Sequence, residues 1–284
     1  MDEVISVRCR GSFHVGGELT TIAGIPVEEF DYSGKFILKI DPNGAHWTKQ
    51  MYVQYTELAD PKLPYPVLMW HGGGLTGVTW ETTPDGREGW ETLFLRHGFD
   101  VYISDSVERG RASWAKFPEV NPCAPVFHTF ESRWLNLKMG ETYPVPYPGQ
   151  RFPVKFYDHL MMQGVPRWVT SDEWTQNAYD AYLKKLSETK TGVVIMAHSQ
   201  GCLFAQKAAL KYPKLVKALI LVEPAGFLGA DADLKTIAHI LQLFVWGDFM
   251  SEKYTTVHAW VDAIRKTHRV TARGLKTPVS ITRG

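Results

Sequence analysis

The stretch Val193–Gly201, read as Val-Val-Ile-Met-Ala-His-Ser-Gln-Gly, constrains the fold more than any other part of the chain. Its first five residues are apolar and predict a buried strand of a parallel sheet. The residues from Gln200 to Leu210 predict a helix, so Ser199 stands at a strand-to-helix corner. Such a corner, the nucleophile elbow, lifts a serine hydroxyl clear of the sheet. The simpler alternative is an ordinary turn that contains a serine.

The residues around Ser199 fit the elbow hypothesis. Ala197 and Gly201, two positions before and after the serine, are small enough for strand and helix to pass close together. Alanine replaces the more usual glycine at the first of these positions. The backbone N–H of Gln200 then points to the place where an oxyanion would form. Ser199 is therefore the candidate nucleophile and Gln200 a candidate oxyanion donor.

The composition favours one globular domain without a cofactor. A chain of 284 residues and 32.2 kDa can bury one large core. A net charge of +1 without a basic block argues against nucleic acid or an acidic membrane surface as partner. No apolar run reaches membrane-spanning length. Three distant cysteines, Cys9, Cys123 and Cys202, suggest neither a disulfide framework nor a metal site. We expect no metal or organic cofactor.

The chain starts with Met-Asp-Glu-Val-Ile-Ser-Val-Arg, which is not a signal peptide, because its charged start is acidic and no apolar core follows. It predicts a cytoplasmic protein, and a leader that has been removed is the alternative. The oligomeric state is left open, and a homodimer is one of the states considered.

A second site motif follows the apolar strand Pro66–Trp70 and reads His71-Gly72-Gly73-Gly74. Glycines after a strand leave backbone N–H groups unshielded. In α/β-hydrolases such a loop supplies the second oxyanion donor, which predicts that role for Gly73. A flexible glycine turn is the simpler alternative.

The residues Thr76–Trp90 read Thr-Gly-Val-Thr-Trp-Glu-Thr-Thr-Pro-Asp-Gly-Arg-Glu-Gly-Trp. This block resembles a small group of bacterial esterases within the α/β-hydrolase superfamily. The resemblance implies an α/β-hydrolase fold, with a mostly parallel, doubly wound sheet and a cap insertion. In the best-known members two adjacent, disulfide-bonded cysteines occupy the positions of Gly73 and Gly74, so the loop here should be more flexible. Residues 89–97 also predict an amphipathic helix with Trp90, Leu93 and Phe94 inward.

The loop Asp105–Ser113 resembles another segment of the same esterases. Its two arginines, Arg109 and Arg111, could bind an anionic substrate group. The interpretation we favour is that they pair with buried carboxylates of the fold.

A carboxylate is needed to orient a catalytic histidine, and two strand ends offer one. Glu223 follows the strand Val216–Val222 in a Val-Glu-Pro sequence, and Asp248 follows the strand 240–246. The resembling esterases use the glutamate of Val-Glu-Pro, which favours Glu223 over Asp248. The simpler alternative is that Val-Glu-Pro merely ends a strand.

Residues 114–170 are rich in proline and aromatic residues and show no sustained helix or strand period. So long a segment in a compact domain is usually functional. We interpret it as a cap over Ser199 whose rings form the pocket for an acyl or alcohol group. His128 and His159 within it are interpreted as surface residues.

The catalytic histidine of this fold follows the last strand. Here the last predicted strand ends near Thr282, and no histidine follows His268. In the resembling esterases a Gly-Asn-Ser-His segment follows at the position of Gly284. We therefore expect residues 1–284 to form one domain whose base lies on a further C-terminal segment, either covalently continuous or a separate fragment. His71, His198, His258 and His268 are poorly placed to replace it.

Taken together, these patterns predict a serine hydrolase that cleaves a small carboxylic ester or lactone with an apolar or aromatic group, through an acyl-enzyme. The alternative is a ligand-binding protein on the same fold that has lost its catalytic base.

Overall fold

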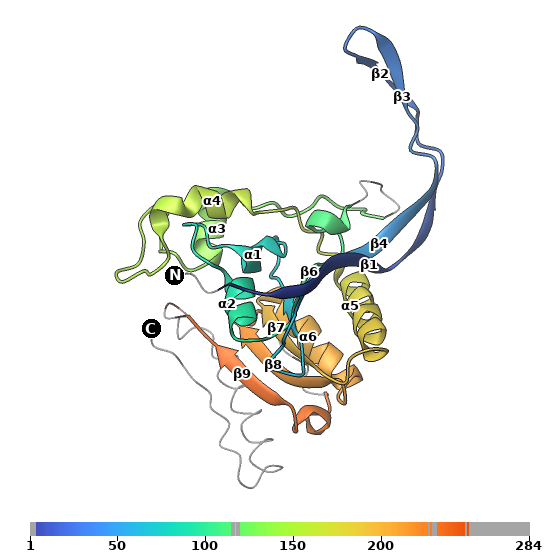
Figure 1. Ribbon diagram of the computed structural model, residues 1–284. Coiled ribbons are helices and arrows are strands. Elements are labelled where there is room, and N and C mark those ends of the chain that lie inside the picture. Colours follow the sequence, from blue (N-terminus) through green and yellow to red (C-terminus); the bar gives the residue numbers. More distant parts are fainter. Residues whose placement is uncertain are drawn as a thin grey trace.

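A mostly parallel sheet forms the centre of the computed structural model, which describes residues 4–114, 117, 120–226, 228, 232–247 and 249 (Figure 1). Its seven strands lie in the order β1-β4-β6-β5-β7-β8-β9. The parallel strands are β5 (Val67–Trp70), β6 (Val101–Asp105), β7 (Val193–His198), β8 (Val216–Val222) and β9 (Leu241–Val245). At one side, β4 (Gly44–Leu58) pairs antiparallel with both β6 and β1 (Val7–Ile22). This arrangement confirms the predicted α/β sheet.

Helices cover both faces of the sheet, because alternate strand residues point to opposite sides. Leu68 and Trp70 share a buried cluster with residues of α5 (Asp172–Ser187) and α6 (Gln200–Lys211). Val67 and Met69 share another with Trp80 and Leu95, from α1 (Val78–Glu81) and α2 (Trp90–Arg96). The fold is therefore doubly wound, as the sequence predicts.

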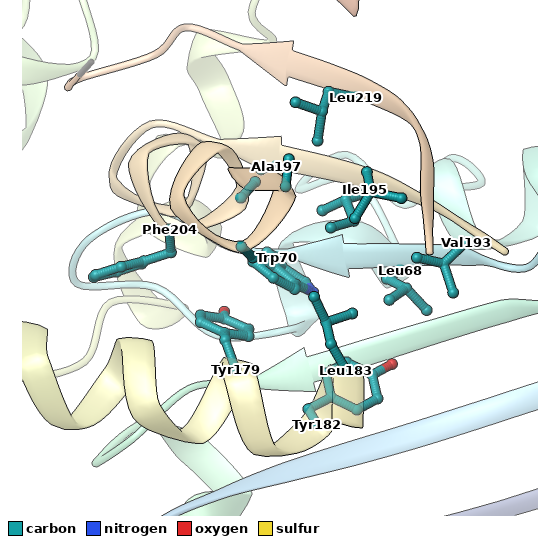
Figure 2. Packing of buried hydrophobic residues seen from close by; sticks show 14 of the residues in the cluster. Leu68, Trp70, Tyr179, Tyr182, Leu183, Val193, Ile195, Ala197, Phe204 and Leu219 are labelled. Carbon is teal, nitrogen blue, oxygen red and sulfur yellow. The ribbon is translucent and has the colours of Figure 1, made fainter. Parts of the chain in front are cut away.

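The larger cluster fixes the two strands that lead to the candidate site. The rings of Trp70 on β5 and Tyr179 on α5 stack with their centroids 3.8 Å apart, and Figure 2 shows Ile195 and Ala197 of β7 beside them. All four side chains are almost completely buried. Close packing of this kind restricts movement, so the C-terminal ends of β5 and β7 are held side by side.

A β-hairpin arm projects from the sheet. β1 and β4 extend beyond it and end in the hairpin of β2 (Glu28–Tyr32) and β3 (Phe36–Ile40), which stands away from the body in Figure 1. All residues of β2 and β3 are exposed, including six large apolar ones: Phe30, Tyr32, Phe36, Ile37, Leu38 and Ile40. The β-rich beginning that the sequence predicts is confirmed: β1 and β4 belong to the central sheet, and β2 and β3 form the tip of the arm.

The segment 114–170 contains more regular structure than its sequence predicts. It includes α3 (Phe130–Asn136), the short 3-10 helix η2 (Val154–Phe156) and α4 (Tyr157–Met162). Trp134, Met139 and Tyr157 are buried together, and the rings of Trp134 and Tyr157 meet edge to face 5.0 Å apart. These large rings therefore pack on one another and form a small core of the segment's own.

The predicted inward face of residues 89–97 is confirmed at Phe94, which packs against the buried cluster of Trp80 and Leu95, and is wrong at Trp90 and Leu93. In α2 the buried side chain is Leu95, whereas Trp90 and Leu93 are exposed by 49% and 40%. The error arises because tertiary packing decides which face of a short helix is buried.

Two short 3-10 helices, η1 (Gly110–Ala112) and η3 (Leu234–Ile237), complete the regular elements of the described residues. No helix in this part of the chain combines the length and the apolar character that crossing a membrane requires.

Candidate active site

Ser199 occupies the turn between β7 and α6 with φ 51° and ψ −115°. A positive φ is uncommon for any residue except glycine, and such backbone strain persists only where the surrounding structure enforces it. Ser199 N–H donates to Val222 O at 2.9 Å, and Ser199 O accepts from Ala225 N–H at 3.2 Å. The sharp strand-to-helix turn that the sequence predicts at this serine is therefore present.

Close packing explains why a glycine, Gly201, stands two positions after Ser199. A methyl group on Gly201 would lie 2.8 Å from His71 O and 2.9 Å from Trp70 O. These distances are shorter than van der Waals contact, so α6 can approach the end of β5 this closely only with glycine here. Gly201 thus brings the helix that begins after Ser199 against the glycine loop that begins at His71.

The glycine loop lies directly beside the serine. A methyl group on Gly72 would lie 3.1 Å from Ser199 Cβ and 2.7 Å from His198 Nδ1. One on Gly73 would lie 3.1 Å from the side-chain oxygen of Gln200. Gln200 is the first residue of α6, where backbone N–H groups lack an intrahelical acceptor. The fold therefore brings together Ser199, Gly73 and Gln200.

His71 holds this loop in place as a neutral side chain. Its Nδ1 donates to Gly72 O at 2.8 Å, and its Nε2 accepts from Ser106 N–H at 3.0 Å. Burial lowers the pKa of His71 to about 4. Both nitrogens are engaged by the backbone, so His71 links the loops after β5 and β6 and is not available as a base.

Glu223 follows β8 with φ 48° and lies beside the next strand. Its backbone N–H donates to Val245 O at 2.9 Å, and its carboxylate accepts from Gly247 N–H. Burial raises the pKa of Glu223. The bonds from Ser199 to Val222 and from Ala225 to Ser199 connect the loop that carries Glu223 to the nucleophile turn.

The other candidate acid, Asp248, lies outside the described residues, as do His258 and His268. None of the eight described histidines bonds to Ser199 Oγ or to the Glu223 carboxylate. Seven contact other groups: His14, His46, His71, His97, His128, His159 and His239. The eighth, His198, has a buried Nδ1 without a partner, and burial lowers its pKa to about 4.

The two arginines singled out from the sequence have different surroundings. Arg111 forms an ion pair with the buried carboxylate of Asp105, with Nε and Oδ2 2.7 Å apart. Arg109 is buried and donates to Pro166 O at 3.0 Å. Arg111 thus pairs with a carboxylate of the fold, as favoured above, whereas Arg109 holds the backbone of the 114–170 segment.

Sequence reasoning missed two other arginines near the glycine loop. Arg133 on α3 donates from Nη2 to Gly74 O at 3.0 Å. Arg167 places its Cδ 3.4 Å from where a methyl group on Gly73 would lie. No local pattern marks them, because their approach to the loop depends on how the 114–170 segment folds back over it.

A separate cavity of about 450 Å³ lies between the base of the arm and the start of the 114–170 segment. Trp47, Gln50, Glu108 and Trp114 are among its lining residues. None of Ser199, Gly73, Gln200 and Glu223 lines it. Among the residues that the structure describes, no three His, Cys, Asp or Glu side chains gather where they could hold a metal ion.

Comparison with known proteins agrees with this architecture. Residues 65–250, more than half of the chain, match the family model of the alpha/beta hydrolase fold. The chain belongs to the α/β-hydrolase family. The matched region includes the glycine loop, the turn at Ser199 and Glu223.

Two known proteins resemble this α/β-hydrolase closely enough to inform its function. The solved structure of a bacterial esterase is 31% identical, has a TM-score of 0.76, and aligns over 94% of this chain and 86% of its own. A probable secreted lipase, phiG, from a fungal species is 28% identical over 235 residues. That alignment covers 80% of this chain but 60% of the lipase, so this α/β-hydrolase spans less than two thirds of the lipase's length.

Proposed function

We propose that this chain is a serine-dependent hydrolase of carboxylic esters or lactones. The observation that carries the proposal is the strained backbone of Ser199, at φ 51° and ψ −115°, beside the glycine loop. Strain of this kind concentrates at functional sites, and an ordinary turn has no need of it. The similarity to a bacterial esterase supports the same reaction class.

The arrangement suggests one role for each residue. Ser199 attacks the carbonyl carbon and forms an acyl-enzyme, which water then hydrolyses. The backbone N–H groups of Gly73 and Gln200 stabilise the negative charge on the carbonyl oxygen. Glu223 orients the histidine that removes the proton from Ser199 and later activates water.

The histidine base is proposed to come from outside the described residues, since the described histidines are engaged elsewhere or buried and neutral. The sequence-based prediction that it follows Gly284 is not tested by the structure and stays a prediction. Replacing His258 and His268 by glutamine, one at a time, separates the possibilities. A variant that loses turnover while keeping its fold would identify the base within residues 1–284.

The segment 114–170 is proposed to act as a cap that borders the substrate. Its contacts with the glycine loop support this: Arg133 binds Gly74 O, and Val165 N–H donates to the same carbonyl at 3.0 Å. Exposed rings of the segment, Phe127 and Phe130 among them, are available to an apolar acyl or alcohol group. We infer that the substrate is a small molecule with such a group.

The decisive experiment measures turnover of aryl esters, thioesters and lactones by the wild-type protein and by Ser199→Ala. The proposal expects hydrolysis of at least one oxygen ester or lactone by the wild type and its loss in Ser199→Ala. Equal activity of the two proteins would contradict the role of Ser199.

A second candidate function is binding without catalysis. It is favoured by one observation, namely that no described histidine contacts Ser199. A ligand-binding protein would bind an ester and release it unchanged, so a product analysis after long incubation distinguishes the two functions.

The cytoplasmic location stays a prediction from the sequence, and one matched relative is called a secreted lipase. Cell fractionation of the natural source tests it.

A further inference from the structure

Two arginine side chains of the 114–170 segment border the glycine loop beside Ser199. Arg133 Nη2 lies 3.0 Å from Gly74 O. Arg167 Cδ and Nε lie 3.4 Å and 3.8 Å from the place where a methyl group on Gly73 would be. The loop that is proposed to bind the oxyanion therefore has two positive side chains along its edge.

Arg133 is buried without a compensating charge. Its exposed fraction is 3%, and its Nε is buried without a hydrogen-bond partner. Across the described residues, the ion pairs that involve arginine use other arginines, and none includes Arg133. Keeping a cation away from water without a partner is costly. A single bond to Gly74 O holds the segment to the loop but leaves the charge unpaired.

Arg167 is only weakly paired. Its Nη2 lies 3.4 Å from Asp172 Oδ1, while the same oxygen accepts a shorter bond of 2.7 Å from Gln200 Nε2. Its Nε is also buried and has no partner. Asp172 is therefore engaged mainly with the residue after the nucleophile, and Arg167 keeps donor capacity on the side of Gly73.

The surrounding charges add to the positive potential. Burial and the positive charge of the nearby Arg167 together lower the pKa of Arg109 to about 10. The carboxylates that oppose Arg109 are Glu108 and Asp172. Glu108 bonds to Asn121 at 2.5 Å and is buried. Asp172 thus faces both Arg109 and Arg167, whereas no ion pair of the described residues includes Arg133.

We propose that the ester or lactone hydrolysed at this site carries a carboxylate group, which Arg133 and Arg167 bind beside the scissile bond. Guanidinium groups are suited to carboxylates because they offer paired, planar donors. The proposal rests on the proposed function of Ser199 for the position of the scissile bond. It goes further by naming the substrate as the monoester or lactone of an acid that keeps a second, free carboxylate. The competing explanation is that Arg133 only anchors the 114–170 segment.

The test measures binding in Ser199→Ala, so that its result does not depend on turnover. Calorimetry compares two ligands: the mono-nitrophenyl ester of adipic acid, and a neutral nitrophenyl ester whose acyl chain ends in an isopropyl group in place of the carboxylate. We expect the charged ester to bind about 10- to 100-fold more tightly, the range of hydrogen bonds to charged groups. Adding Arg133→Met or Arg167→Met should remove most of this preference.

The controls separate charge recognition from structure. Arg151→Gln alters an exposed arginine of the same segment and should leave the preference unchanged. Arg167 is 29% exposed, so its replacement keeps the test valid if Arg133→Met fails to fold. Equal affinity for the two esters, or a preference that survives in a folded Arg167→Met protein, would overturn the proposal.

Turnover by the wild type then distinguishes this inference from the proposed function. Hydrolysis of the neutral ester with no preference for the charged one would leave the hydrolase function intact and refute the carboxylate site. Charged-ester preference in binding without any turnover would support the carboxylate site and refute the hydrolase function.

Discussion

The backbone N–H of Ser199 donates a 2.9 Å hydrogen bond to the carbonyl oxygen of Val222, the residue before Glu223. This bond continues the parallel register of β7 and β8, in which His198 lies opposite Val222. The candidate nucleophile and the candidate acid thus leave neighbouring strands at the same level. Their relative position is set by sheet geometry rather than by flexible loops, which is what a catalytic pair requires.

Replacing the candidate acid tests this pairing. Glu223→Gln should keep the fold and reduce turnover by about 100-fold or more, because a neutral amide cannot stabilise an imidazolium. Steady-state kinetics on a hydrolysed ester measures the effect. Asp248→Asn is the matched control and should cost much less. The reverse order would move the acid to the loop after β9.

Because α6 and β5 are in close contact at Gly201, we expect any side chain at position 201 to destabilise the fold. Gly201→Ala would place a methyl carbon 2.8 Å from His71 O, so backbone must shift. We expect a loss of about 1–3 kcal/mol in the free energy of unfolding, typical of overpacking. Urea denaturation measures it. The control, Gly226→Ala, meets only the flexible side chain of Leu203 at 3.3 Å and should be milder. Equal effects would contradict the close approach.

We expect a larger loss in the free energy of unfolding when Asp105 is replaced, because its carboxylate joins three parts of the site's framework. Its carboxylate is buried and accepts from Gly77 N–H at 2.6 Å, from Arg111 N–H at 2.9 Å and from Arg111 Nε at 2.7 Å. These bonds lower the pKa of Asp105 although burial opposes them. Asp105→Asn should destabilise the fold by about 3–5 kcal/mol, as when one partner of a buried ion pair is removed. Asp85→Asn, at a pair whose Arg87 is largely exposed, should cost much less. Similar values for the two variants would contradict this account.

Two buried histidines predict a loss of stability in acid. Burial lowers the pKa of both His71 and His198 to about 4, whereas an unfolded histidine titrates near about 6.5. As pH falls through this window the unfolded chain takes up more protons than the folded chain, so stability falls with pH, by about 1.4 kcal/mol per pH unit for each group.

His198→Asn isolates one of these contributions. It should reduce the slope of unfolding free energy between pH 6.5 and 4 by about 1.4 kcal/mol per unit, and leave the slope above pH 7 unchanged. Subtracting the two profiles removes the opposing effect of Glu91, Glu108 and Glu223, whose pKa values burial raises. Parallel profiles would show that His198 is not buried as a neutral group.

The sequence was sufficient to predict the sheet, the turn at Ser199, the glycine loop and the strand end at Glu223. These features are local: an apolar run sets each strand, and small residues permit the close approaches at Gly72 and Gly201. The side chains that tie the 114–170 segment to the loop could not be predicted in the same way. Arg133 reaches Gly74 across 59 positions of the chain, and only the folded path of the segment selects it.

The error in the inward face of α2 has the same origin. Trp90 and Leu93 have the spacing of an inward face, yet α2 buries Leu95. In a helix of only seven residues, the packing of neighbouring elements decides which side is buried. The pocket expected from the aromatic residues between 114 and 170 stays a prediction, and two of these residues, Trp134 and Tyr157, pack against each other. Composition shows that aromatic residues are abundant, but it does not show which residues they pack against.

Covalent labelling tests the central claim most directly. A fluorophosphonate probe reacts with a serine only when it is activated as a nucleophile. Intact mass followed by peptide mapping of the wild-type protein should find one probe on Ser199, and none on the Ser199→Ala protein under the same conditions. An unlabelled wild type, or equal labelling of both proteins at another residue, would contradict the assignment of Ser199 as the nucleophile.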